Sequence, residues 1–162
     1  MPTPKGFTMI ELIVVITLIS ILGVYAQSRF DSGAFEERYF SDDVISSLRF
    51  AQKYAIATGC AVQFNLTTTG FHLMAETESE CSSATVSSFS RTVKRPWNNE
   101  PFVNQAALPP AITLTSTSVV FYPQGWACDA TGSDYTTTSI ALNGGTNRTI
   151  NVECNTGFVH QS

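Results

Sequence analysis

Residues 12–28 form an uncharged apolar run, and this run limits what the chain can fold into. It consists mainly of Leu, Ile and Val, and no charged residue lies between Glu11 and Arg29. A helix that begins near Phe7 and continues for about 22 residues reaches roughly 33 Å at 1.5 Å per residue. The hydrocarbon core of a bilayer is about 30 Å thick. The run therefore predicts a membrane-spanning helix over residues 7–28.

The flanks of this helix predict its orientation. Lys5 is the only charged side chain before Glu11, and a short positive flank tends to stay in the cytoplasm. The rest of the chain would then lie outside that membrane. The four cysteines, an even number, agree with such an oxidising compartment.

Two simpler interpretations of the run compete with this one. A secretory signal peptide needs a cleavage site of small residues after its apolar core, and Tyr25-Ala26-Gln27-Ser28 is a poor one. A plain membrane anchor leaves Glu11 unexplained. An ionised carboxylate in lipid costs about 2.5 kcal/mol or more, so such residues usually have a partner and a function.

The residues around Glu11 resemble a known processing signal. Residues 5–12 read KGFTMIEL and precede the apolar run, as in the class III leader of type IV pilins and pseudopilins. The resemblance implies that residues 1–6 are a leader, that a prepilin peptidase cuts between Gly6 and Phe7, and that Phe7 becomes N-methylated. Glu11 would take the place of the family's fifth mature residue. In a filament its carboxylate can pair with the Phe7 ammonium of a neighbouring subunit, which leaves neither charge buried alone.

The same resemblance implies partners and a location. The partners are the prepilin peptidase, the other major and minor pilins of a hetero-oligomeric filament, the inner membrane and the assembly platform proteins. The chain would cross the bacterial inner membrane once, with a periplasmic head over residues 29–162, and would then enter the pilus or pseudopilus filament.

A second helix is predicted after the polar break at residues 31–33. Apolar side chains recur there at spacings of three and four, which predicts an amphipathic helix over residues 34–58 that packs on a sheet. These side chains are Phe40, Val44, Leu48, Ala51 and Ala55. Gly59 follows at the position where a glycine often ends a helix. Tyr39 and Phe50 lie off this stripe, where they could contact neighbouring subunits.

The chain from Cys60 onward is typical of a β-rich domain. Alternating patterns predict a hairpin of strands 61–66 and 71–75, a strand over 119–122, and a second hairpin of strands 139–142 and 149–154. Weaker patterns cover 86–93 and 112–114, and the proline-rich segment 96–110 is interpreted as a loop. The expected fold class is α+β: a long N-terminal transmembrane helix that continues into an amphipathic helix, packed on a C-terminal β-rich head of two sheets.

This order of elements resembles the GspH/FimT-type minor pilins and pseudopilins. The resemblance is carried by LRFAQKYAIATGCAVQFNL at 48–66, VVFYPQGWA at 119–127 and RTINVECNTGFV at 148–159. AQKYAIATGC at 51–60 and FSRTVKRPW at 89–97 resemble minor pilins of the mannose-sensitive haemagglutinin (MSHA) pilus. The resemblance implies a minor type IV pilin that takes part in pilus assembly or priming and in surface attachment. The first alternative is an H-type pseudopilin of a type II secretion system. The second alternative is a tip adhesin or DNA-uptake receptor.

The four cysteines are expected to form two disulfides. Cys60, Cys81, Cys128 and Cys154 allow three pairings. The hairpin that ends just before Cys81 favours Cys60–Cys81, which leaves Cys128–Cys154 as the second bond. A zinc site would need closely spaced pairs such as C-x₂-C, and these cysteines are about 20 residues or more apart.

Catalytic and ligand-binding signals are sparse. Neither His72 nor His160 lies in a motif with a nucleophile and an orienting acid, so no enzyme activity, cofactor or metal is expected. The acidic residues Glu76, Glu78 and Glu80, and the pair Asp129 and Asp134, are interpreted as solvated chain rather than as a carboxylate pair or a Ca²⁺ loop.

Nucleic acid is not expected as a partner. The formal net charge is −4, whereas domains that bind nucleic acid are usually basic. Some FimT-type relatives bind DNA through arginines near the C-terminus, and residues 157–160 contain none. One feature would favour nucleic-acid binding: the basic cluster Arg91–Arg95, with Trp97 beside it for stacking.

Overall fold

The structure is a computed structural model that falls into two compact units, Met1–Ser32 and Gly33–Ser162. The described residues are 6–27, 32–77, 81, 88–104, 108–109, 112–129, 137–143 and 147–162.

Helix α1 (Met9–Gln27) begins after an N-cap threonine. The backbone N–H of Glu11 donates to Thr8 Oγ1 at 3.3 Å, and the N–H of Leu12 donates to the Thr8 carbonyl at 3.2 Å. Farther along the helix, the hydroxyls of Thr17 and Ser20 donate to backbone carbonyls of the preceding turn. These two hydroxyls are thus satisfied without water, as an apolar environment requires.

Helix α2 (Ser32–Thr58) is amphipathic, and the predicted stripe is its buried face. Phe40, Val44, Leu48, Ala51 and Ala55 are all buried, which confirms that prediction. The helix ends where Gly59, at φ 71°, donates its N–H to the Ala55 carbonyl at 2.9 Å. Glycine suits this position because its φ is in the left-handed region.

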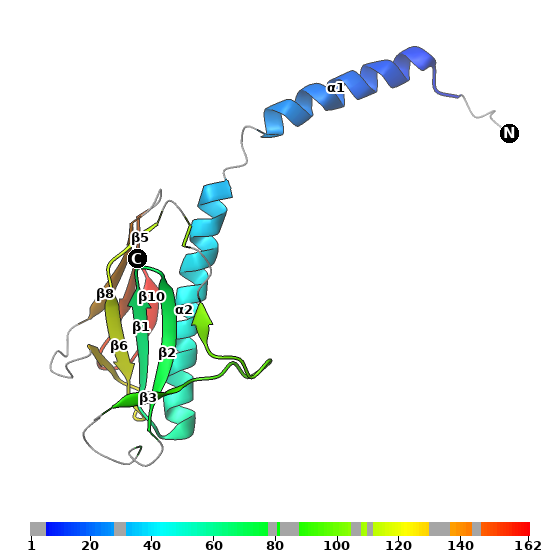
Figure 1. The fold of residues 1–162 in the computed structure, drawn as a ribbon. Coiled ribbons are helices and arrows are strands. Elements are labelled where there is room, and N and C mark those ends of the chain that lie inside the picture. The colour runs from blue at the N-terminus through cyan, green and yellow to red at the C-terminus, as the bar shows by residue number, and fades with distance from the viewer. Residues whose placement is uncertain are drawn as a thin grey trace. The chain divides into compact units, whose positions relative to one another are not determined.

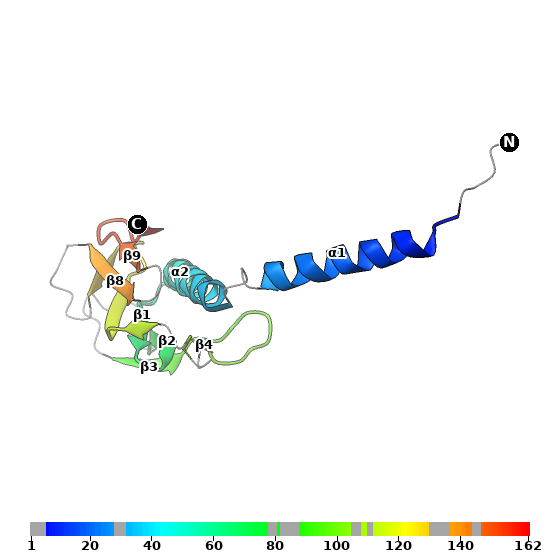
Figure 2. The same ribbon diagram turned by 90° about the horizontal axis from the view of Figure 1, so that it is seen from above.

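The strands form two antiparallel sheets that lie alongside α2 (Figure 1). The six-stranded sheet has the order β3-β2-β1-β6-β7, and β4 also pairs with β2. Its strands are β1 (Val62–Thr67), β2 (Gly70–Glu76), β3 (Phe89–Thr92), β4 (Val103–Asn104), β6 (Thr117–Phe121) and β7 (Ala127–Asp129). The four-stranded sheet has the order β10-β9-β8-β5. It consists of β5 (Thr113–Leu114), β8 (Thr138–Asn143), β9 (Arg148–Val152) and β10 (Val159–Gln161). Figure 2 shows α2 nearly end-on, with strands of both sheets beside it.

One core joins the two sheets to α2. Its largest fully buried side chains are Phe64, Phe71 and Phe121. The ring centroid of Phe71 lies 5.2 Å from that of Phe64 and 6.4 Å from that of Phe40. Both predicted hairpins form, with Leu66 opposite Phe71 and Ile140 opposite Ile150. The α+β class, with a helix packed on a β-rich head, is therefore confirmed.

The remaining sequence predictions need small corrections. The segment 96–110 is not loop throughout, because Val103–Asn104 forms β4 against β2. Of the predicted strand 86–93, Phe89–Thr92 is β3 and residues 86–87 lie outside the described part. Strands β7 and β10 were not predicted. Each has three residues, which is too short for an alternating pattern to show.

Candidate assembly site

The N-terminal end of α1 holds the three residues expected to direct processing and assembly. Gly6 and Phe7 precede the helix, and the Phe7 side chain is 79 % exposed. Gly6 is exposed, and a Cβ added there would meet no atom within 4 Å. Cleavage at this bond and methylation of Phe7 stay predictions.

Glu11 is the one charged side chain of α1. It lies in the first turn, where the helix dipole favours a carboxylate. Within the described part of the chain, no group donates a hydrogen bond to that carboxylate; the Glu11 backbone N–H, by contrast, bonds Thr8. A carboxylate on an apolar helix without such a donor needs a partner from another molecule once water is removed.

The rest of α1 is apolar on every side. Residues Met9–Ala26 are long and apolar enough to cross a membrane, with a mean hydropathy of 2.4, and none of this segment is buried within the chain. Exposed large side chains include Ile10, Leu12, Ile16, Ile19 and Leu22. An exposed surface of this kind is stable in lipid or against other apolar helices, not in water.

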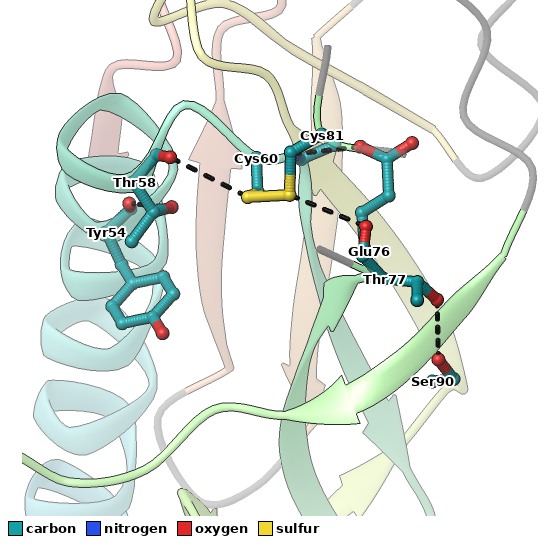
Figure 3. The surroundings of a disulfide bond; sticks show 8 residues. Tyr54, Thr58, Cys60, Glu76, Thr77, Cys81 and Ser90 are labelled. Carbon is teal, nitrogen blue, oxygen red and sulfur yellow. Dashed lines mark hydrogen bonds between the residues drawn. A yellow bond between two sulfur atoms is a disulfide. The ribbon is translucent and has the colours of Figure 1, made fainter. Parts of the chain in front are cut away.

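A disulfide joins Cys60 to Cys81, with their Cα atoms 4.3 Å apart (Figure 3). Cys60 follows the end of α2 and leads into β1, while Cys81 follows the end of β2. Near the bond, the hydroxyls of Thr77 and Ser90 lie 2.7 Å apart and connect the β2 end to β3. The disulfide therefore links the segment between α2 and β1 to the segment after β2, at the open end of the first hairpin.

Cys128 and Cys154, the second predicted pair, are both buried. They lie on adjoining segments, because the Ala127 N–H donates to the Cys154 carbonyl at 2.7 Å. Their pairing stays a prediction.

The other candidate residues that the structure describes do not converge on a metal site. His72 on β2 lies opposite Asn65 on β1, and the His160 ring stacks on Phe158 at 5.6 Å. Among the described residues, no three His, Cys, Asp or Glu side chains are placed to hold a metal ion. Of the acidic residues considered from the sequence, Glu76 is buried, whereas Glu78, Glu80 and Asp134 lie outside the described residues.

Within the basic cluster, Arg95 is packed into a hairpin, whereas Lys94 and Trp97 are exposed. The Arg95 guanidinium lies 5.8 Å from the Trp97 ring and 5.4 Å from the Phe102 ring, and it donates to the Val103 carbonyl at 2.8 Å. Phe102 is buried and stacks on Phe50 at 4.8 Å. Arg95 therefore supports the hairpin that carries Trp97.

Sequence reasoning missed the clamp that Gln52 forms. Its Nε2 donates to the carbonyls of Gly125 and Thr156, both at 2.8 Å, and so ties α2 to two turns distant in the sequence. Gly157, at φ 62°, lies against this clamp, where a Cβ would come within 2.4 Å of the Gly125 oxygen. In the sequence, only the glycine at position 157 hinted at this clamp. The sequence does not reveal contacts between segments that are this far apart.

Two family models match the chain. Residues 1–26 match the prokaryotic N-terminal methylation motif, and residues 41–157 match type II transport protein GspH. Neither a curated protein nor a solved structure matches. The motif implies processing by a prepilin peptidase and assembly with other pilins or pseudopilins, and the proteins of these families are structural rather than enzymatic. The second model covers most of the chain, so the chain belongs to the GspH family of type IV minor pilins and pseudopilins.

Proposed function

We propose that this chain is a minor type IV pilin of the MSHA type, which takes part in assembly or priming of the pilus and in surface attachment. The motif at 1–26 and the GspH-type head support a filament subunit. The segments 51–60 and 89–97 support the narrower MSHA type by resemblance.

The proposed mechanism is lateral packing of α1 against other subunits, with Glu11 paired to the N-terminal amine of a neighbouring Phe7. The observation that carries it is the Glu11 carboxylate on an apolar helix, with no donor among the described residues. Cleavage after Gly6 creates the required ammonium group at Phe7. Pairing removes two charges from the apolar filament core together, because each neutralises the other.

The proposed route begins in the inner membrane. Residues 1–6 are removed as a leader, residues 7–28 cross the membrane once, and the head over residues 29–162 lies in the periplasm. The candidate span Met9–Ala26 and the disulfide at Cys60–Cys81 support this placement. The subunit then leaves the membrane for the filament, through the assembly platform proteins.

The test is the amount of surface filament sheared from cells that lack this gene, compared with wild type and with a complemented strain. A pilin needed for assembly gives few filaments in the deletion strain and wild-type levels after complementation. Unchanged filament levels in the deletion strain would contradict the assembly role.

The second candidate is an H-type pseudopilin of a type II secretion system, which the matched GspH model favours directly. The helix and the Glu11 pairing would act in the same way in a short pseudopilus. The two candidates separate in the same deletion strain, because loss of a pseudopilin leaves secreted enzymes in the periplasm while surface pili remain. The position of the gene beside pilus or secretion genes gives an independent answer.

A further inference from the structure

A groove crosses three neighbouring strands of the six-stranded sheet. It has a volume of about 420 Å³ and lies over β2, β1 and β6, which are adjacent in the sheet (Figure 1). Sites for small ligands have volumes of about 300–1,000 Å³ and use a few polar groups to orient the ligand. The polar residues that line this groove are Asn65, Thr67, His72, Ser116, Thr117 and Ser118. Its size and its polar lining make it a candidate ligand site.

The register of the three strands places polar side chains in one row across the groove. Asn65 on β1 lies opposite His72 on β2 and opposite Ser118 on β6. We call these three residues the polar row. Successive side chains of a strand point to opposite faces of the sheet, and the neighbours of Asn65, Phe64 and Leu66, belong to the core that contains the buried stripe of α2. The polar row therefore lies on the face of the sheet away from this core.

Hydrogen bonds along the sheet orient the polar row. The Asn65 amide donates to Gln63 Oε1 at 3.0 Å, and the Gln63 amide donates to Ser118 Oγ at 3.5 Å. These bonds leave Asn65 Oδ1 as an acceptor and the Ser118 hydroxyl as a donor. His72 makes no hydrogen bond to another described residue, and its neutral ring offers one donor and one acceptor. Because these side chains are half-buried and partly ordered in advance, a ligand would bind them at a lower entropy cost.

The four-stranded sheet carries a row of the same three residue types, which we call the second row. Asn151 on β9 lies opposite Ser139 on β8 and opposite His160 on β10. The Ser139 hydroxyl donates to Asn151 Oδ1 at 2.9 Å, and Asn151 Nδ2 donates to the Ser162 hydroxyl at 3.2 Å. The second row thus uses both ends of its amide within the chain. Among the described residues, by contrast, none donates to Asn65 Oδ1 in the polar row.

The lining of the groove selects a neutral ligand that is rich in hydroxyl groups. Cationic side chains bind anions most strongly, and carboxylates are the usual ligands of hard metal cations. Among the described residues that line the groove, none is Lys, Arg, Asp or Glu. Hydroxyl, carboxamide and imidazole groups instead pair well with groups that both donate and accept hydrogen bonds. The hydroxyl groups of a sugar do both.

We propose that this groove binds a neutral saccharide, whose hydroxyl groups bond the polar row. His72 and Ser118 are two strand spacings apart, which is about 10 Å. A ligand that reaches both is longer than one sugar ring, so the expected ligand is a disaccharide or a longer chain. This inference rests on the surface-attachment part of the proposed function and assigns to it a site and a class of ligand.

The first experiment offers the purified full-length chain, in detergent, to a printed array of neutral and acidic glycans. We expect the chain to bind neutral glycans of two or more hexose or N-acetylhexosamine units. Sialylated and sulfated glycans of the same length should bind no better, because the described lining residues include no Lys or Arg. The neutral glycan that binds best on the array then serves as the probe in a titration.

The decisive step measures the Kd of that glycan for single variants. Asn65→Ala and His72→Ala should each raise the Kd on the order of tenfold, because each removes a hydrogen-bonding group from the polar row. His72→Gln keeps one donor and one acceptor and should retain most of the affinity. Asn151→Ala, the same substitution in the second row, is the matched control and should leave the Kd unchanged. Thermal unfolding of each variant checks that the head is folded.

Three outcomes would overturn the inference: no neutral glycan binds, acidic glycans bind better than neutral ones, or Asn151→Ala weakens binding as much as Asn65→Ala does. Glycan binding is measured without filaments, so its failure leaves the filament role and the Glu11 mechanism standing. Unchanged filament levels in the deletion strain would contradict the assembly role and leave the glycan result as it is.

Discussion

At the scale of single residues, two glycines share a backbone conformation but differ in their surroundings. Gly59 and Gly157 have φ of 71° and 62°. A Cβ at Gly59 would meet no atom within 4 Å, whereas one at Gly157 would come within 2.4 Å of the Gly125 oxygen and 2.5 Å of Gln52 Nε2. Substitutions at these two glycines therefore separate two contributions to the free energy of unfolding: the strain of a left-handed backbone and the steric clash of an added Cβ.

The first prediction compares Gly157→Ala with its control, Gly59→Ala. We expect Gly59→Ala to lower the free energy of unfolding by about 1 kcal/mol, from backbone strain alone. Gly157→Ala should cost about 2 kcal/mol more, because the backbone oxygen of Gly125 has to move and the Gln52 clamp is disturbed. Urea titration of the full chain in detergent measures both. Equal losses would show that the close packing around Gly157 is not important.

At the scale of elements, the buried stripe of α2 connects the helix to both sheets. Its positions could be predicted because a spacing of three and four is visible within one segment. The Gln52 clamp and the three-residue strands β7 and β10 could not, since they depend on segments that meet only in the fold. Of the candidate site, Glu11 and the Cys60–Cys81 pairing were accessible from local sequence patterns.

The second prediction concerns the buried stripe of α2. Leu48 is fully buried, with no exposed area, so Leu48→Ala leaves a cavity in the core. We expect it to lower the free energy of unfolding by about 2–5 kcal/mol. Ser46→Ala, on the exposed side of the same helix, should change it by less than about 0.5 kcal/mol. A loss below 1 kcal/mol for Leu48→Ala would mean that α2 contributes little to the stability of the head.

The third prediction counts thiols. The chain purified from the periplasmic side should carry both disulfides, so that maleimide under denaturing conditions labels no cysteine before reduction and all four after it. The measurement is the mass of the intact chain. Two labels before reduction, located at Cys128 and Cys154, would show that only the Cys60–Cys81 bond forms.

At the scale of the whole molecule, the chain joins an exposed apolar helix to a folded head that has its own buried core. The described side chains of α1 are exposed along its length, so this helix needs lipid in the membrane and other helices in a filament. Glu11 fits badly in lipid and well beside an ammonium group. In the proposed mechanism, its position favours transfer of the chain from lipid to the filament.

The most direct test of that account measures the fraction of the chain that enters sheared filaments, relative to the fraction left in the membrane, for Glu11→Ala. Thr17→Val is the control, because the Thr17 hydroxyl is satisfied by the Val14 carbonyl within the same helix. We expect Glu11→Ala to be cleaved after Gly6 like wild type, and its fraction in filaments to fall on the order of tenfold or more. Thr17→Val should enter filaments normally. Wild-type incorporation of Glu11→Ala would contradict the pairing of Glu11 with the Phe7 amine.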